Sequence, residues 1–134
     1  MIAYTLDTNI ISYILKGNET LTSRLTEELK KGNKIIINTV TYYEICRGML
    51  SIDSHNKLSQ FKKICISLGI AEFSRNILDK AAEIYATLRK NGIIIDDADI
   101  FIAAICIENG LVLVTNNEKH FENINGLEIE NWCK

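Results

Sequence analysis

The sequence has 134 residues, of which 47% are hydrophobic and 24% charged, and its formal net charge is −2. This length corresponds to one domain with a core of its own, and the composition is too apolar for intrinsic disorder and too mixed for a fibrous protein. No apolar run reaches the roughly 20 residues of a membrane helix, and the N-terminus lacks the basic segment of a signal peptide, so we expect a single cytoplasmic domain spanning residues 1–134 that is not attached to a membrane.

Short apolar runs alternate with amphipathic stretches along the chain. In chain order the pattern predicts a strand at 2–6, helices at 8–15 and 21–29, a strand at 34–38, helices at 43–50 and 58–68, a weak strand at 70–73, helices at 77–88 and 97–107, a strand at 111–115, a polar turn at 116–120 and a last strand at 127–130. Strands that alternate with helices through short connections favour an α/β fold with a mainly parallel sheet.

The charge balance and the cysteines exclude several kinds of site. A protein that binds nucleic acid through bulk charge is usually clearly basic, which this chain is not. The four cysteines, Cys46, Cys65, Cys106 and Cys133, form no C-x-x-C pair and have no nearby histidine. We therefore interpret them as buried or half-buried thiols rather than as zinc ligands or disulfides. No Gly-rich turn follows the first strand and no G-x-S-x-G segment is present, which disfavours a dinucleotide site and a serine hydrolase.

Three acidic residues fall near predicted helix starts, and each has a purely structural explanation. Asp7 follows the first strand and can cap the next helix. Thr41 and Glu44 have the spacing of a capping box. Asp99 follows Asp96 by three residues, so both can favour a helix start through the helix dipole.

Taken together, the same acids predict a metal site. Functional groups of an open parallel sheet gather beyond the carboxyl ends of its strands, and Asp7, Glu44 and Asp99 can all reach that edge. Three converging carboxylates repel one another unless a cation lies among them. Oxygen ligands without Cys or His suit Mg²⁺ or Mn²⁺ rather than zinc, and such an ion can activate water against a phosphodiester. Asn9 adds a neutral hydrogen-bonding group two residues after Asp7.

Four segments resemble, in order, the motifs of PIN-domain nucleases, and together with the C-terminus they cover nearly the whole chain. The similar segments are Leu6-Asp7-Thr8-Asn9, Thr41-Tyr42-Tyr43-Glu44-Ile45 with Gly48, Asp99-Ile100-Phe101-Ile102-Ala103-Ala104, and Val114-Thr115-Asn116-Asn117 with Phe121. The final segment, residues 127–132, resembles the tail of VapC-type toxins.

This resemblance implies a PIN-like three-layer α/β/α sandwich and a metal-dependent endoribonuclease that uses Mg²⁺ or Mn²⁺ to cleave RNA. It also implies a toxin that forms a homodimer, is inhibited by a cognate antitoxin and reaches operator DNA only through that antitoxin. Asp7, Glu44 and Asp99 would be the metal-binding acids, with Asn9 and Thr115 in support. The alternative is a catalytically inactive PIN-like binding module that acts through the antitoxin and DNA, because one fold hosts many functions.

Some residue roles stay open at this point. Related proteins often carry a further acid in the fourth motif, where this chain has Asn117 and His120. Asn117 can orient the attacking water and His120 can contact phosphate, or both can belong to a simple turn. Asp96 and Asp97 compete with Asp99, although a helix cap better explains Asp96 and solvent exposure better explains Asp97. Finally, Arg47 can pair with Glu44 or meet a phosphate, and a surface ion pair is the commoner arrangement.

Overall fold

The computed structural model describes all residues 1–134, and strands and helices alternate along the chain as predicted. In chain order the elements are β1 (Ala3–Leu6), α1 (Thr8–Leu15), α2 (Glu19–Lys30), β2 (Lys34–Asn38), α3 (Thr39–Ser51), α4 (His55–Leu68), β3 (Ile70–Ala71), α5 (Arg75–Lys90), α6 (Asp97–Asn109), β4 (Val112–Val114), α7 (Glu118–Phe121) and β5 (Ile129–Glu130). No helix is both long and apolar enough to span a membrane.

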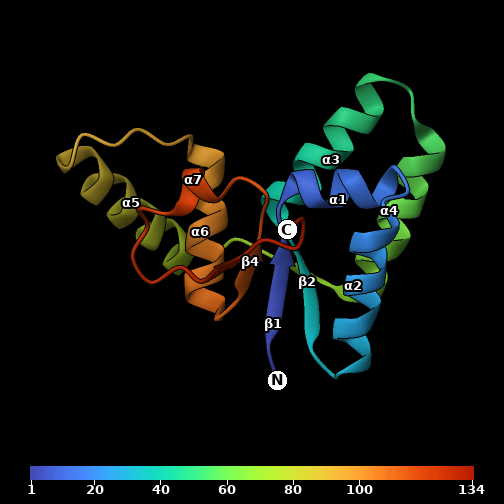
Figure 1. Ribbon diagram of the computed structural model, residues 1–134. Helices are drawn as coiled ribbons and strands as arrows, with labels where there is room; N and C mark the ends of the chain where they lie inside the picture. Colours follow the sequence, from blue (N-terminus) through green and yellow to red (C-terminus); the bar gives the residue numbers. More distant parts are fainter.

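The strands form one five-stranded sheet in the order β3-β2-β1-β4-β5, and every neighbouring pair is parallel. Tyr4 in the central strand lies opposite Ile35 of β2 and Val112 of β4. Because all strands run the same way, their carboxyl ends share one edge of the sheet. A helix that directly follows a strand therefore begins at this edge. Figure 1 shows α1, α3 and α6 starting at that edge.

Helices cover both faces of the sheet, so the predicted three-layer α/β/α architecture is confirmed. Successive strand residues point to opposite faces. Tyr4 and Leu6 pack with residues of α1–α4, whereas Leu113 packs with α5 and α6. Figure 1 shows these two groups of helices on opposite sides of the strands. A strand that is buried on both faces needs apolar residues at nearly every position, which is why these strands read as continuous apolar runs.

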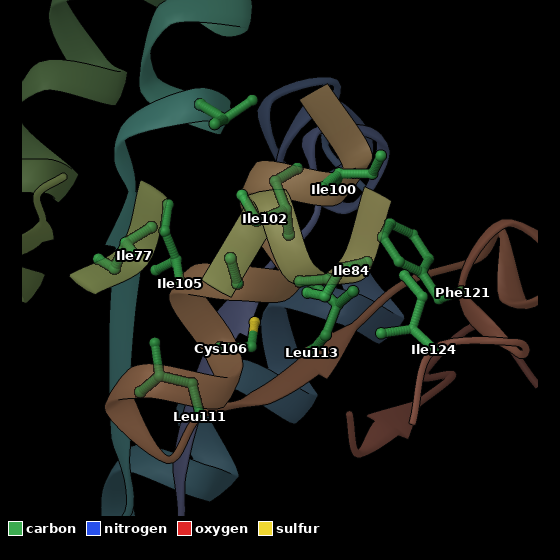
Figure 2. Packing of buried hydrophobic residues seen from close by; sticks show 14 of the residues in the cluster. Ile77, Ile84, Ile100, Ile102, Ile105, Cys106, Leu111, Leu113, Phe121 and Ile124 are labelled. Carbon is green, nitrogen blue, oxygen red and sulfur yellow. The ribbon is translucent and has the colours of Figure 1, made fainter. Parts of the chain in front are cut away.

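Helix α6 lies between α5 and the sheet. Six of its residues are buried in one apolar cluster: Ile100, Ile102, Ala103, Ala104, Ile105 and Cys106. A helix that is apolar all round is typical of such an enclosed position. Figure 2 shows α6 side chains packed together with Ile77 and Ile84 of α5 and Leu113 of β4 in this cluster. This packing holds the first turn of α6, which carries Asp99, at the carboxyl edge of the sheet.

Three local predictions are wrong. Helix α3 begins at Thr39 because the Asn38 side chain accepts a hydrogen bond from the Thr41 backbone N–H at 2.8 Å, so Thr41 and Glu44 are not a capping box. The predicted turn after β4 contains the short helix α7, which places Phe121 in the core. All four cysteines are free thiols, but Cys133 is exposed at the C-terminus instead of buried or half-buried.

Candidate acidic site at the carboxyl edge of the sheet

Asp7 occupies the turn between β1 and α1 and is 5% exposed. Its backbone N–H donates to the carbonyl of Val114 at 2.8 Å, which ties the turn to the end of β4. One carboxylate oxygen, Oδ1, accepts from the Thr8 backbone N–H at 2.8 Å, and Oδ2 accepts from the Thr115 hydroxyl at 2.8 Å. Asp7 is therefore the helix cap that its position predicts, and it is also held rigidly between two strand ends.

Asp7 is a buried acid without an ion-pair partner. Burial raises its pKa above the usual value, and the charge of Glu44 raises it further. The hydrogen bonds from Thr115 and Thr8 and the charge of His120 lower it, but the net effect is an increase. The ion pairs at this edge belong to Glu44 and Asp99 instead. A buried carboxylate normally has an ion-pair partner or a metal ion, so the surroundings of Asp7 favour a cation.

Glu44 reaches the same edge from α3. Its Oε1 accepts from the Thr8 hydroxyl at 2.6 Å, and its Oε2 lies 3.6 Å from Nη2 of Arg47. The second contact is the surface ion pair that the sequence predicted. Thr8 thus contacts Glu44 through its hydroxyl and Asp7 through its backbone N–H. Sequence reasoning missed this role of Thr8, because no local pattern shows that its hydroxyl meets a residue 36 positions away.

Asp99 lies in the first turn of α6, and its side chain is 19% exposed. Its Oδ2 is 3.1 Å from Nδ1 of His120. Burial raises the pKa of Asp99, the charge of Asp7 raises it further, and His120 opposes both effects. Asp97 is exposed, as predicted. Asp96 is the capping residue by position, but its side chain makes no capping hydrogen bond.

The remaining predicted residues surround this cluster in different ways. The Thr115 hydroxyl donates to Asp7 and accepts from the Asn117 backbone N–H at 2.9 Å, which connects the fourth motif to the first. Asn117 is thus held through its backbone, and its side chain makes no hydrogen bond to an acid. Asn9 is half-buried in the first turn of α1 and likewise makes no side-chain hydrogen bond to the cluster.

The donor chemistry of the three acids fits a hard divalent cation, although their side chains are not arranged as a complete coordination site. All their ligand atoms are carboxylate oxygens, which suit Mg²⁺ or Mn²⁺. Their charges also interact unfavourably, because Glu44 raises the pKa of Asp7 and Asp7 raises the pKa of Asp99. No three acidic, histidine or cysteine side chains are arranged to hold a metal ion. The Thr8 hydroxyl and the Arg47 guanidinium contact Glu44, and the His120 imidazole contacts Asp99. A bound cation would compete with these groups for the carboxylate oxygens.

A cavity of about 210 Å³ adjoins Asp99. Its polar wall includes Lys119, His120 and Asn123, and its apolar wall is formed by the segment 93–95. The cavity therefore opens beside the acidic edge of the sheet. Its lysine places a positive charge next to the negatively charged cluster. A separate cavity of about 290 Å³ between α5 and the segment 123–126 is lined by none of the acids of the site.

Comparison with known proteins identifies the family. The PIN domain family matches residues 4–127. The chain is 33% identical over 132 residues to ribonuclease VapC2 of Rickettsia felis, with 98% of both chains covered. It is 29% identical over 133 residues to the tRNA(fMet)-specific endonuclease VapC of Shigella flexneri, with 98% of this chain and 99% of that protein covered.

Solved structures agree with the sequence relatives. A chain in the crystal structure of VapBC2 from Rickettsia felis, bound to a DNA fragment from their promoter, superposes with a TM-score of 0.89 at 32% identity, covering 98% of this chain and 99% of that one. The order of the motifs, the parallel sheet and the acidic edge all agree with this match. The chain belongs to the PIN domain family and, within it, to the VapC ribonucleases.

Proposed function

We propose that this protein is an endoribonuclease toxin that hydrolyses RNA phosphodiester bonds with Mg²⁺ or Mn²⁺ held by Asp7, Glu44 and Asp99. The observation that carries the proposal is the buried Asp7 carboxylate, which has no ion-pair partner and faces two further acids across the ends of the parallel strands. Membership of the VapC ribonucleases supports the same activity. Residues 1–134 would act as one domain in the cytoplasm, where RNA is found.

Each side chain has a distinct part in this proposal. Asp7 is the rigid ligand, because a backbone N–H and the Thr115 hydroxyl fix both of its oxygens. Glu44 and Asp99 complete the acidic set from α3 and α6. The bound cation would supply Lewis-acid polarisation of the phosphodiester and a more acidic water. Asn117 would orient the attacking water, His120 would contact phosphate beside Asp99, and Asn9 would support the acids from α1.

The partners follow from the relatives. The Rickettsia felis VapC2 protein is seen in a VapBC2 assembly with promoter DNA. By similarity, we propose that this chain binds a cognate antitoxin, reaches operator DNA through that antitoxin and forms a homodimer. The Shigella flexneri relative is named a tRNA(fMet)-specific endonuclease, so initiator tRNA is the first substrate to test.

The test is metal-dependent cleavage by the purified protein. Transcribed initiator tRNA and a single-stranded RNA of mixed sequence are incubated with wild type or Asp7→Asn, in Mg²⁺, in Mn²⁺ and in EDTA. We expect defined cleavage ends with metal, none in EDTA and none above background for the variant. Sequencing the ends identifies the site. If wild type and Asp7→Asn are equally inert on every RNA in both metals, the inactive binding-module alternative replaces the proposal.

A further inference from the structure

We propose that Tyr43 and Arg47, which are stacked on the outer face of α3, form a platform that binds the RNA strand beside the metal-binding acids. Tyr43 would stack on a base and Arg47 would contact a backbone phosphate. This inference rests on the proposed ribonuclease function and adds the residues that hold the substrate.

The platform is defined by exposure and contact. Tyr43 is 60% exposed, and the side chain of Arg47 is 59% exposed. The Arg47 Cζ lies 5.1 Å from the centre of the Tyr43 ring, within the range of a cation–π contact. On its other side, Arg47 Nη2 lies 3.6 Å from Glu44 Oε2. An exposed aromatic ring and a planar cation are thus placed side by side, one contact away from a proposed metal ligand.

A continuous series of contacts leads from this platform to the buried acid. Glu44 accepts a hydrogen bond from Thr8 at 2.6 Å, and the Thr8 backbone N–H donates to Asp7 at 2.8 Å. An RNA phosphate bound at the acids would therefore have its neighbouring nucleotide next to Tyr43 and Arg47. Because of this proximity, the pair can contact a substrate bound at the acids, which a surface ion pair elsewhere on the protein cannot do.

The chemistry of the pair matches single-stranded RNA. Bases that are not in a duplex stack on aromatic side chains and on arginine planes. Arginine carries five N–H donors in a planar fork, so a contact to Glu44 leaves donors free for phosphate. An anionic substrate approaching three acids also benefits from positive charge beside them, and Arg47 supplies it through its ion pair with Glu44.

The same protein contains a second pair of the same kind that serves as a matched control. On α5 the Cζ of Arg89 lies 5.7 Å from the Tyr85 ring centre, and Tyr85 is 45% exposed. This pair has the same i,i+4 spacing and similar exposure, but it makes no hydrogen bond or ion pair with an acid of the site. Any effect of stacking or charge on the surface in general should therefore be equal at both pairs.

The experiment measures RNA binding and cleavage separately. Binding of a labelled single-stranded RNA is measured by fluorescence anisotropy in the Asp7→Asn background, where no cleavage occurs, and KM and kcat are measured in the otherwise native protein. We expect Tyr43→Leu to weaken binding and raise KM by about 5- to 100-fold with kcat unchanged, the size of one lost base stack. Tyr43→Phe should restore both values, and Tyr85→Leu should change neither.

Two further measurements identify the contacts. A single abasic nucleotide, moved stepwise through the cleavage site of a short RNA, should at one position weaken binding of wild type while leaving Tyr43→Leu unaffected. Arg47→Met should reduce the magnitude of the slope of log affinity against log salt by about 0.7, the value for one lost phosphate contact on a single strand, whereas Arg89→Met should leave the slope unchanged.

The outcomes separate this inference from the proposed function. If wild type cleaves RNA and Tyr43→Leu matches it in KM and binding, the platform is wrong and the ribonuclease stands. Equal losses in Tyr43→Leu and Tyr85→Leu would also overturn it, as would normal RNA binding combined with weakened binding of the antitoxin, which would assign the surface to a protein partner. If wild type cleaves no RNA, both proposals fall.

Discussion

Asp7 and Glu28 are the two buried carboxylates of this protein, at 5% and 2% exposure, and their surroundings differ. Glu28 on α2 has two cations near its Oε2, Arg24 Nε at 3.4 Å and Lys31 Nζ at 3.6 Å. Its Oε1 accepts from the Asn33 amide at 3.0 Å. Asp7 has hydrogen-bond donors but no ion-pair partner; the charge of Glu44 raises its pKa, and His120 supplies the only charge that opposes this effect.

Because their surroundings differ, the charges of Glu28 and Asp7 have opposite effects on the stability of the fold. At Glu28, burial alone would raise the pKa, but the Asn33 hydrogen bond and the charges of Lys31 and Arg24 lower it below its usual value. Its contribution to stability is therefore present above the unfolded pKa and is lost as the pH falls through the folded one. The raised pKa of Asp7 means the opposite: its contribution is present below the unfolded pKa and is lost as the pH rises through the folded one.

This contrast separates an acid that the fold neutralises from the acid that we propose binds the metal ion. The fold neutralises Glu28 with its own side chains, so no ligand is needed there. The fold leaves Asp7 buried, without an ion-pair partner and close to Glu44, so its charged form is disfavoured in the absence of a cation. Perturbed acids of this kind gather at functional sites. Substitutions of these acids and addition of Mn²⁺ can break or confirm the contrast between Asp7 and Glu28.

Asp7→Asn should abolish cleavage without weakening the fold. Losing a metal ligand should reduce the cleavage rate by about 100-fold or more, since even indirect partners of a metal cost 10- to 100-fold. Because the variant no longer buries a charge, its thermal midpoint at pH 7 should equal or exceed that of wild type, and the difference should vanish near pH 3. Thermal melts across this pH range check the sign. A large drop in stability at pH 7 would contradict the comparison.

Asp99→Asn should also impair cleavage, whereas Asp96→Asn should not. We expect a roughly 10- to 100-fold slower rate and weaker Mn²⁺ binding for Asp99→Asn, because one carboxylate of the cluster loses its charge. Asp96 is exposed and makes no capping hydrogen bond, so its variant should behave like wild type. Rates and Mn²⁺ affinity are compared at matched folding. Loss of cleavage in Asp96→Asn alone would show that Asp96 is the third acid.

Mn²⁺ should stabilise the wild-type protein and not Asp7→Asn. A ligand that binds only the folded state adds about 2.7 kcal/mol of stability at 100 times its Kd. The stabilisation should be largest near neutral pH, where the acids are ionised, and Glu28→Gln should retain it in full. Denaturant unfolding with and without Mn²⁺ measures the difference. Equal stabilisation of wild type and Asp7→Asn would place the cation elsewhere.

Glu28→Gln should have the smallest effect, and on stability alone. Removing this charge leaves Arg24 and Lys31 without their buried partner and should cost about 1–3 kcal/mol at pH 7. The loss should shrink as the pH falls below the usual pKa of glutamate, because the wild-type side chain then becomes neutral as well. Urea unfolding at several pH values tests this. A variant that unfolds normally yet cleaves RNA slowly would show that Glu28 is not only structural.

Local patterns predicted most of the fold for a physical reason. The strand at 34–38 and the helix at 8–15 lie where the apolar spacing places them. In the strand and in the helix, the apolar residues that set the local periodicity are also the residues that face the core. The N-terminus of α3 was not predicted, because Thr39 and Val40 are β-branched residues that favour strands locally, and Asn38 starts the helix there only once it meets the Thr41 backbone N–H.

The sequence by itself determined the order of the elements, the α/β class and the positions of Asp7, Glu44 and Asp99 near helix starts, because periodicity and motif spacing are local properties of the chain. Tertiary structure alone decided what each acid meets. The Thr8 contact to Glu44, the Thr115 contact to Asp7 and the His120 contact to Asp99 join residues 36, 108 and 21 positions apart. The opposite electrostatic states of Asp7 and Glu28 arise in the same way, since burial and counter-charges exist only after the layers have packed.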